Sequence, residues 1–339
     1  MEIDILGIDL AKHVFQLHGA GRNGQAVHRS KITRGALIET VHKLCPRIVV
    51  MEACSSAHHW ARRFIALGIE VRLISPHYVT PFVKTNKNDR NDAEAIVEAA
   101  SRPTMRFVSI KSIEQEDIQA VHRMRAILVR QRTAIINQVR GLLAERGLIV
   151  ARSVQAFKRA VPDLLSSEDS ELTTFCQSLV TDMLQHLQAL ETRIRWLETA
   201  IKDFVRNSAL CRKITAVEGV GPLTATAIVG AIGDAKQFSN GRHLAAWLGL
   251  VPRQYSSGGK ARLQGISKRG DTYLRTLLIH GARTVLQYAS GKTDKRSRWL
   301  QQLIARRGYN CAAVALANKN ARILQVLLST NASYKPAAV

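Results

Sequence analysis

Four acidic residues occupy positions from which their carboxylates can act together. Asp9 ends one apolar run, residues 3–8, and Glu52 ends another in RIVVMEA. Asp89 and Asp92 lie three residues apart at the expected start of a helix, so they share one helical face. If that face meets the sheet edge, the carboxylates converge and need cations to offset their repulsion. Oxygen ligands favour Mg²⁺, and two ions roughly 4 Å apart stabilise the attacking and leaving oxygens of a phosphodiester.

Each acid also fits a structural role. Asp9 fits a turn, and Glu52 fits an ion pair with Lys12 or Arg72. The two later aspartates fit caps of the helix that follows them. Taken together, in a strongly basic chain, the four favour the metal cluster.

The charge of the chain indicates a polyanionic partner. The 339 residues include 49 Lys and Arg against 26 Asp and Glu, a net charge of +23. From Arg206 to Val339 there are 21 basic and 4 acidic residues. This asymmetry favours nucleic acid over an ordinary metabolic substrate. Scattered cysteines, the lack of a signal peptide and the lack of a long apolar run predict a cytoplasmic protein without a membrane span.

The first hundred residues alternate strand-like and helix-like patterns. Three consecutive strands are expected at residues 3–9, 13–19 and 25–32, and two more at 47–53 and 69–76. Helices are expected at residues 34–45, 56–68 and 88–101. This order predicts an α/β domain with a mixed sheet over residues 1–110.

The middle of the chain, residues 111–206, predicts a coiled-coil helical hairpin. From Val180 to Phe204, apolar residues recur at alternating steps of three and four. Upstream, apolar residues recur every seven from Val121 to Leu142, and a connector with Pro162 joins the two arms. The first arm is rich in arginine, which suits dimerisation or nucleic-acid binding; the candidates for the latter are Arg123, Arg125, Arg130 and Arg132.

The last third, residues 207–339, predicts a mainly α-helical basic domain. VEGVGPLTA before a helix is typical of a helix-hairpin-helix motif, in which Gly219 and Gly221 let the backbone approach a phosphate. An ordinary interhelical turn is the alternative. Residues 290–308 form a second basic, helix-like stretch that suits phosphate binding.

These motifs resemble those of a known family. GIDLAK, MEACSSAHHW and NKNDRNDAEAI are similar to the Asp-Glu-Asp-Asp signature of the RuvC-like transposases of insertion-sequence family 110. VEGVGPLTATAIV and GISKRGDTYLR resemble the C-terminal transposase domain of that family. The resemblance extends from about residue 3 to about residue 330. It implies an RNase H-like first domain, a magnesium-binding acidic tetrad and guidance by a bridge RNA.

The resemblance also implies a serine nucleophile that forms a phosphoserine link to DNA. Matching the Tyr-x-Ser-Gly pattern places this serine at Ser257, with Ser256 as its neighbour. Without the resemblance, the Ser-Ser-Gly-Gly segment would be read as a flexible turn. The surrounding basic residues suit phosphate binding: Arg253, Lys260, Arg262, Lys268, Arg269 and Arg275.

The expected function is therefore that of a magnesium-dependent, RNA-guided DNA recombinase that mobilises an insertion sequence in a bacterial cell. Donor and target DNA and the guide RNA are its expected partners, and dimers that pair into tetramers are its expected assembly. A hydrolytic junction resolvase that uses water is one alternative. A non-catalytic RNA- or DNA-binding protein is another. An actin-like ATPase would need further glycine-rich phosphate loops, which the first domain lacks.

Overall fold

The computed structural model describes residues 2–83, 89–167, 172–258 and 260–335, and for residues 89, 90 and 261 the backbone alone. The chain forms two compact units. The first contains Met1–Ile113 and Ile232–Ser239, and the second contains Glu114–Ala231 and Asn240–Val339. The division into three domains expected from the sequence stays a prediction. In the described ranges, no helix combines the length and apolar content that a membrane span requires.

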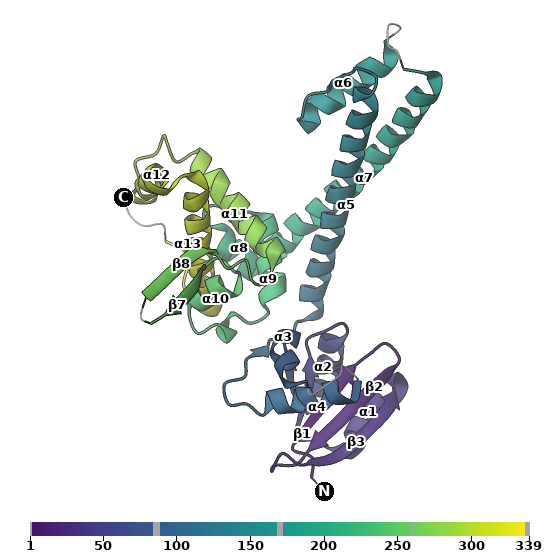
Figure 1. The fold of residues 1–339 in the computed structure, drawn as a ribbon, viewed down its shortest axis with the longest axis vertical. Helices are drawn as coiled ribbons and strands as arrows, with labels where there is room; N and C mark the ends of the chain where they lie inside the picture. Colours follow the sequence, from purple (N-terminus) through teal and green to yellow (C-terminus); the bar gives the residue numbers. More distant parts are fainter. Residues whose placement is uncertain (1, 84–88, 168–171, 259, 336–339) are drawn as a thin grey trace. The chain divides into compact units, whose positions relative to one another are not determined.

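A six-stranded mixed sheet is the centre of the first unit (Figure 1). Its strand order is β3-β2-β1-β4-β5-β6. Strand β2 pairs antiparallel with both β1 and β3. Strand β4 pairs parallel with both β1 and β5, and β6 pairs antiparallel with β5. The expected mixed α/β sheet is confirmed. The strand bounds are Ile5–Leu10, Val14–Ala20, Ala26–Thr33, Ile48–Glu52, Glu70–Ile74 and Phe107–Val108.

Helices cover both faces of this sheet. Alternate strand residues point to opposite sides, and apolar side chains on both sides are buried by the helices. Leu6 and Ile8 of β1 pack in one core with Trp60 and Phe64 of α2 (Ala57–Ala66) and with residues of α1 (Leu37–Leu44). On the opposite face, Val50 of β4 packs in a second core with residues of α4 (Asp89–Ala100) and α3 (Pro76–Val79). The first unit is therefore a three-layer α/β/α arrangement.

A glycine lets α4 lie directly on β1. A Cβ atom added at Gly7 would be 2.6 Å from Cγ2 of Val97 and 2.7 Å from the carbonyl oxygen of Ala93. Both contacts are shorter than real Cβ atoms show, so a larger residue would push the helix away from the strand. Gly7 therefore lets α4 lie close to β1, the strand that contains Asp9.

Replacing Gly7 with alanine should destabilise the first unit by about 1–3 kcal/mol, the usual cost of overpacking. Gly35→Ala is the matched control, because an added Cβ at that position meets nothing within 4 Å. Urea unfolding of both variants checks the prediction. Equal stability of the two variants would contradict the close approach of α4 to β1.

Two long helices form the arms of a hairpin in the second unit (Figure 1). They are α5 (Ile113–Ala144) and α7 (Thr174–Asn207). Leu128 of α5 packs with Leu190, Ile194 and Leu197 of α7, so the apolar row expected in the second arm is buried. The coiled-coil supercoil stays a prediction. In the connector between the two arms, Pro162 lies inside a third helix, α6 (Val154–Ser166), which packs on the hairpin through its apolar face.

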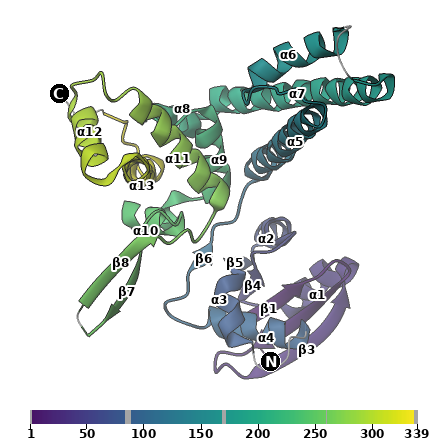
Figure 2. The same cartoon turned by 45° about the horizontal axis from the view of Figure 1, so that its top comes forward.

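The remainder of the second unit is mainly helical, as expected, with one two-stranded sheet. Polar side chains cap four of its helices: Ser208, Asn240, Asp271 and Asp294 each accept a hydrogen bond from a backbone N–H of the first turn. The helices are α8 (Ala209–Thr215), α9 (Pro222–Ile232), α10 (Gly241–Trp247), α11 (Thr272–Gln287), α12 (Lys295–Arg307) and α13 (Tyr309–Ser329). The strands β7 (Pro252–Ser257) and β8 (Lys260–Ile266) form a hairpin that projects from them (Figure 2).

A buried histidine links three helices of the second unit, α5, α9 and α11. His122 of α5 is 4% exposed. Its Nδ1 lies 2.9 Å from the hydroxyl of Tyr273 on α11, and its Nε2 lies 2.9 Å from Oγ1 of Thr226 on α9. Burial, with a smaller effect of the Arg125 charge, lowers the pKa of His122 from 6.5 to about 4. The imidazole is therefore neutral at pH 7 and acts as a structural link.

This depressed pKa predicts a loss of stability in mild acid. Between pH 6.5 and pH 4 the unfolded chain binds a proton at His122 that the folded chain does not, so the unfolded state is favoured as the pH falls. Between pH 7.5 and pH 4.5 the loss should be about 2.5 kcal/mol. His122→Gln keeps hydrogen-bonding groups but cannot titrate, so its stability should depend less on pH by that amount. Urea unfolding at both pH values tests this, and identical pH dependence in the two proteins would contradict it.

Candidate active site and nucleic-acid interface

Asp9 and Glu52 lie side by side at the ends of two paired parallel strands. Ile8 of β1 is in register with Met51 of β4, so the next residues along these strands are Asp9 and Glu52. Asp9 lies two residues after Gly7, and Glu52 lies two residues after Val50, so each acid points to the same side as its partner in the same strand. This is the sheet face that α4 covers. Each is partly buried. The pairing of β1 with β4 therefore brings two of the four predicted acids together.

The thiol of Cys54 responds to both carboxylates. Burial raises its pKa, and the negative charges of Glu52 and Asp9 raise it further. Two residues after β4, Cys54 is thus in the shared electrostatic field of the two acids.

The two later acids belong to α4. Asp92 is partly buried and lies one turn before Ile96, a core residue on the side of the helix that meets the sheet. The backbone of Asp89 begins the helix, while its side chain lies outside the described residues. Among described side chains, no group of three or more His, Cys, Asp or Glu is arranged to hold a metal ion. Convergence of all four carboxylates stays a prediction.

Ser257 is the last residue of β7, where the hairpin turns. It pairs with Lys260 of β8, and Tyr255 pairs with Arg262. Because directly paired residues point to the same face, Ser257 shares a face with the side chains of Lys260 and Arg262. The preceding Ser256 points to the other face, where its hydroxyl accepts a hydrogen bond from Nε2 of Gln254 at 2.8 Å. The interpretation of this segment as a flexible turn did not include the two strands that flank the turn.

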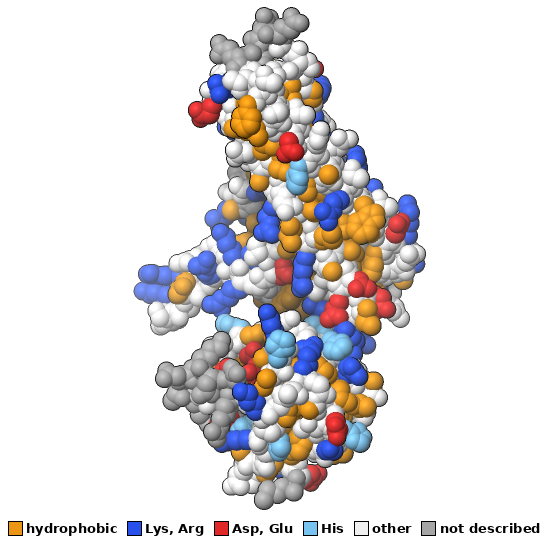
Figure 3. All heavy atoms as spheres, turned by 90° about the vertical axis from the view of Figure 1, so that its right-hand side faces the viewer, with side chains coloured by type: hydrophobic (Ala, Val, Ile, Leu, Met, Phe, Trp, Pro, Cys, Tyr) orange, Lys and Arg blue, Asp and Glu red, His pale blue; other side chains and the backbone are white. Residues whose placement is uncertain are grey.

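Exposed cations accompany the serine along the hairpin and at its base. Arg253, Lys260 and Arg262 are exposed, and so are Lys268 and Arg269 after β8. A basic surface of this kind can hold successive phosphates. On the face drawn in Figure 3, Lys and Arg side chains are more widespread than Asp and Glu.

Arg275 differs from these residues because its guanidinium is used inside the protein. It is 7% exposed, and its Nη1 donates to the carbonyl oxygens of Leu248 and Arg269, both at 3.2 Å. Nη2 donates to Oγ1 of Thr272 at 3.1 Å. The phosphate-binding role expected from the sequence does not suit this geometry. Arg275 instead holds the two ends of the segment that carries the hairpin.

The arginines of α5 are also in different environments. Arg123 and Arg130 are exposed. Arg125 is partly buried and pairs with Glu198 of α7, with an N–O distance of 2.6 Å. Arg132 is partly buried, and its Nε finds no hydrogen-bond partner among the described residues. The exposed pair is therefore better placed for a polyanion than Arg125.

Gly219 and Gly221 lie in the turn between α8 and α9. Gly219 has a φ of +86°, and its backbone packs on Gly281 of α11, where an added Cβ would be 1.8 Å from the Gly219 carbonyl oxygen. Gly221 is open, with nothing within 4 Å of an added Cβ. The first glycine thus serves internal packing, and the second leaves the start of α9 accessible.

The contrast between Arg275 and the hairpin arginines predicts different costs of substitution. Arg275→Gln should lower the free energy of unfolding by about 2–3 kcal/mol, because charge-assisted hydrogen bonds to buried carbonyls are lost. Arg262→Gln should change it by less than about 0.5 kcal/mol, as is usual for an exposed side chain. Urea titration measures both. A neutral Arg275→Gln variant would rule out the structural role.

Similarity to known proteins covers both units of the chain. Residues 6–146 match a transposase family model with an Asp-Glu-Asp-Asp designation of the IS110 type, and residues 211–302 match the model of the Transposase IS116/IS110/IS902 family. A probable family 20 transposase of Pseudomonas aeruginosa is 52% identical over 99% of this chain and all of its own length.

Two further relatives are described as transposases of insertion sequences. That of element IS1111A of Coxiella burnetii is 48% identical over 98% of this chain and 92% of its own length. That of element IS1328 of Yersinia enterocolitica is 39% identical over 96% of each chain. With its mixed-sheet first unit and mainly helical second unit, the protein belongs to the IS110 family of insertion-sequence transposases.

Proposed function

We propose that this transposase cuts and rejoins DNA through a covalent bond to Ser257, with divalent cations held by Asp9, Glu52, Asp89 and Asp92. The observation that carries the proposal is the register of β1 and β4, which aligns Asp9 with Glu52 on the face covered by α4. The carboxylates belong to the first unit, and Ser257 belongs to the second.

The described carboxylates suit a hard divalent cation. Asp9 and Glu52 offer oxygen donors only, as Mg²⁺ prefers, and two like charges on neighbouring strands gain stability when a cation lies between them. Asp92 approaches from the helix that packs on the same face. Bound Mg²⁺, which we propose as two ions, would supply Lewis-acid stabilisation of the charge that develops on the phosphodiester.

The serine step conserves the phosphodiester bond. The hydroxyl oxygen of Ser257 forms a bond to phosphorus and loses its proton, while the bond from phosphorus to one deoxyribose oxygen breaks and that oxygen leaves as a hydroxyl. Attack by a deoxyribose hydroxyl of another strand reverses these changes and releases the serine. Lys260 and Arg262, on the same face of the hairpin, offset the negative charge of the phosphate.

RNA guidance and oligomeric assembly are parts of the proposal that rest on the resemblance. Both units carry excess positive charge for DNA and a guide RNA, and Arg123 and Arg130 offer an exposed basic stretch on α5. We propose a dimer that pairs into a tetramer, acting at the nucleoid in the bacterial cytoplasm.

The decisive test is a search for a covalent protein–DNA adduct. The chain is expressed with the DNA that flanks its element, which should encode any guide RNA, and incubated with Mg²⁺ before a denaturing gel. Wild type and Ser256→Ala should form the adduct, while Ser257→Ala should lose it because the attacking oxygen is absent. Asp9→Asn and Glu52→Gln should reduce it by at least about a hundredfold, if the carboxylates hold the metal.

Other outcomes identify the competing functions. Cleavage without an adduct in wild type and Ser257→Ala would indicate a hydrolytic junction resolvase that activates water. DNA binding without cleavage, unchanged in Asp9→Asn, would indicate a non-catalytic nucleic-acid-binding protein. Loss of the adduct in Ser256→Ala alone would move the nucleophile by one residue.

A further inference from the structure

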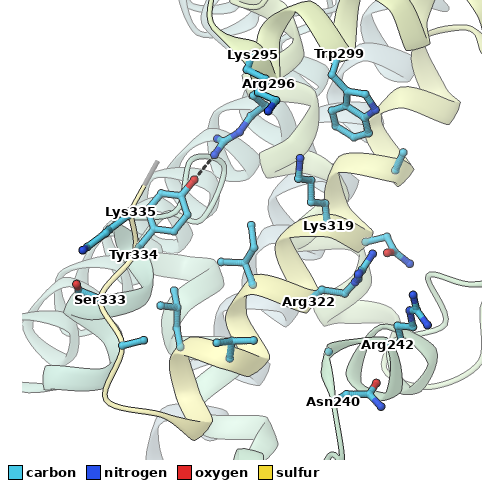
Figure 4. A pocket seen from close by; sticks show the side chains of 17 residues that line it. Asn240, Arg242, Lys295, Arg296, Trp299, Lys319, Arg322, Ser333, Tyr334 and Lys335 are labelled. Atoms are coloured by element: carbon cyan, nitrogen blue, oxygen red, sulfur yellow. Dashed lines mark hydrogen bonds between the residues drawn. The ribbon is translucent and has the colours of Figure 1, made fainter. Parts of the chain in front are cut away.

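A hollow in the second unit gathers positive charge away from the serine hairpin. It has a volume of about 1260 Å³ and is lined by α10, α12, α13 and the segment that follows α13 (Figure 4). This exceeds the roughly 300–1,000 Å³ that a small ligand takes. It therefore has room for a segment of a chain. Six basic and no acidic side chains line it: Arg242, Lys295, Arg296, Lys319, Arg322 and Lys335.

Most of this charge is available to a ligand. Of the six, only Arg296 forms an ion pair within the part of the chain that the structure describes, with Glu218 at 2.7 Å. Arg242, Lys319 and Arg322 are exposed and come from two helices. A concave surface with one sign of charge concentrates polyanions.

Two aromatic rings lie among these cations. Trp299 of α12 is partly buried, and Nζ of Lys319 lies 4.8 Å from the centre of its ring. Tyr334 is held from the other side by a hydrogen bond between Nη2 of Arg296 and its hydroxyl. Aromatic rings beside phosphate-binding cations are the recurring design of sites for unpaired nucleotides, because bases stack on the rings.

A glycine fixes the width of the hollow. An added Cβ at Gly241 would be 2.8 Å from Cα of Arg322 and 2.9 Å from its Cβ. The start of α10 therefore lies against α13, and Arg242 is placed next to Arg322 (Figure 4). Along α13, Lys319 and Arg322 are three residues apart and face the hollow together.

We infer that this hollow binds a single-stranded segment of nucleic acid, with one base stacked on Trp299 and its phosphates held by Lys319, Arg322 and Arg242. A base in a duplex is already stacked on its neighbours and does not reach a recessed ring. The inference rests on the proposed function only in that the partner is a nucleic acid. It needs neither the serine nor the metal.

Fluorescence anisotropy with the full-length Ser257→Ala protein, without divalent cations, tests the inference. The probes are labelled oligo-dT and oligo-U of twelve nucleotides and a DNA duplex of the same length. Trp299→Ala should weaken single-strand binding about tenfold, and Trp299→Phe should restore most of it, because a ring remains for stacking. Duplex binding should change less than twofold. Loss with oligo-dT alone would identify a DNA strand, loss with oligo-U alone an RNA segment, and loss with both a site for either.

Matched variants control for folding and general charge. Trp196 is 64% exposed on α7, outside the hollow, so Trp196→Ala should leave binding unchanged. Lys319→Gln with Arg322→Gln should reduce the slope of log affinity against log salt by about 1.4 for single strands. Lys292→Gln with Arg298→Gln removes two exposed cations that do not line the hollow and should reduce it less. Three results would overturn the inference. The first is that Trp299→Ala and Trp196→Ala weaken single-strand binding equally, and the second is that Trp299→Ala weakens duplex binding as much as single-strand binding. The third is that polyglutamate competes with the labelled single strand as well as an unlabelled single strand does.

Discussion

The parallel pairing of β1 with β4 is the constraint on which the first unit depends. The register places two carboxylates at neighbouring strand ends, on the face that α4 covers. Gly7 allows that helix to lie directly on the strand, which brings the half-buried Asp92 toward the same face. Like charges on neighbouring strands repel each other, and a cation that lies between them offsets this repulsion. The metal site that we propose is therefore built on the pairing of these two strands.

The second unit carries most of the excess positive charge of the chain. Its positive charge is divided between internal and external uses. Arg275 and Arg125 are bound to carbonyl oxygens or to Glu198, and they hold the scaffold. Two groups of exposed cations lie on the hairpin of Ser257 and around the hollow of Trp299. Separate basic surfaces suit a protein that handles more than one nucleic-acid strand.

Parts of this arrangement are readable from the sequence. The apolar runs that end in Asp9 and Glu52 predict buried strands, and the mixed sheet follows from the order of the elements. The β7–β8 hairpin was not predicted, because every residue of β7 is exposed and no alternation marks it. Composition also cannot separate Arg275 from Arg262, since burial is decided by distant carbonyls. The hollow joins segments far apart in the chain, although Lys319 and Arg322, the charged residues of α13, were a signal of it.

We propose that the pairing of β1 with β4 builds a metal site from Asp9 and Glu52. The most direct measurement is anomalous diffraction from crystals of the full-length protein soaked with Mn²⁺ as a substitute for Mg²⁺. We expect a peak about 2.1 Å from oxygens of both carboxylates, and we expect this peak to be lost in crystals of Asp9→Asn. Mn²⁺ bound only elsewhere, or an occupied site that survives Asp9→Asn, would contradict it.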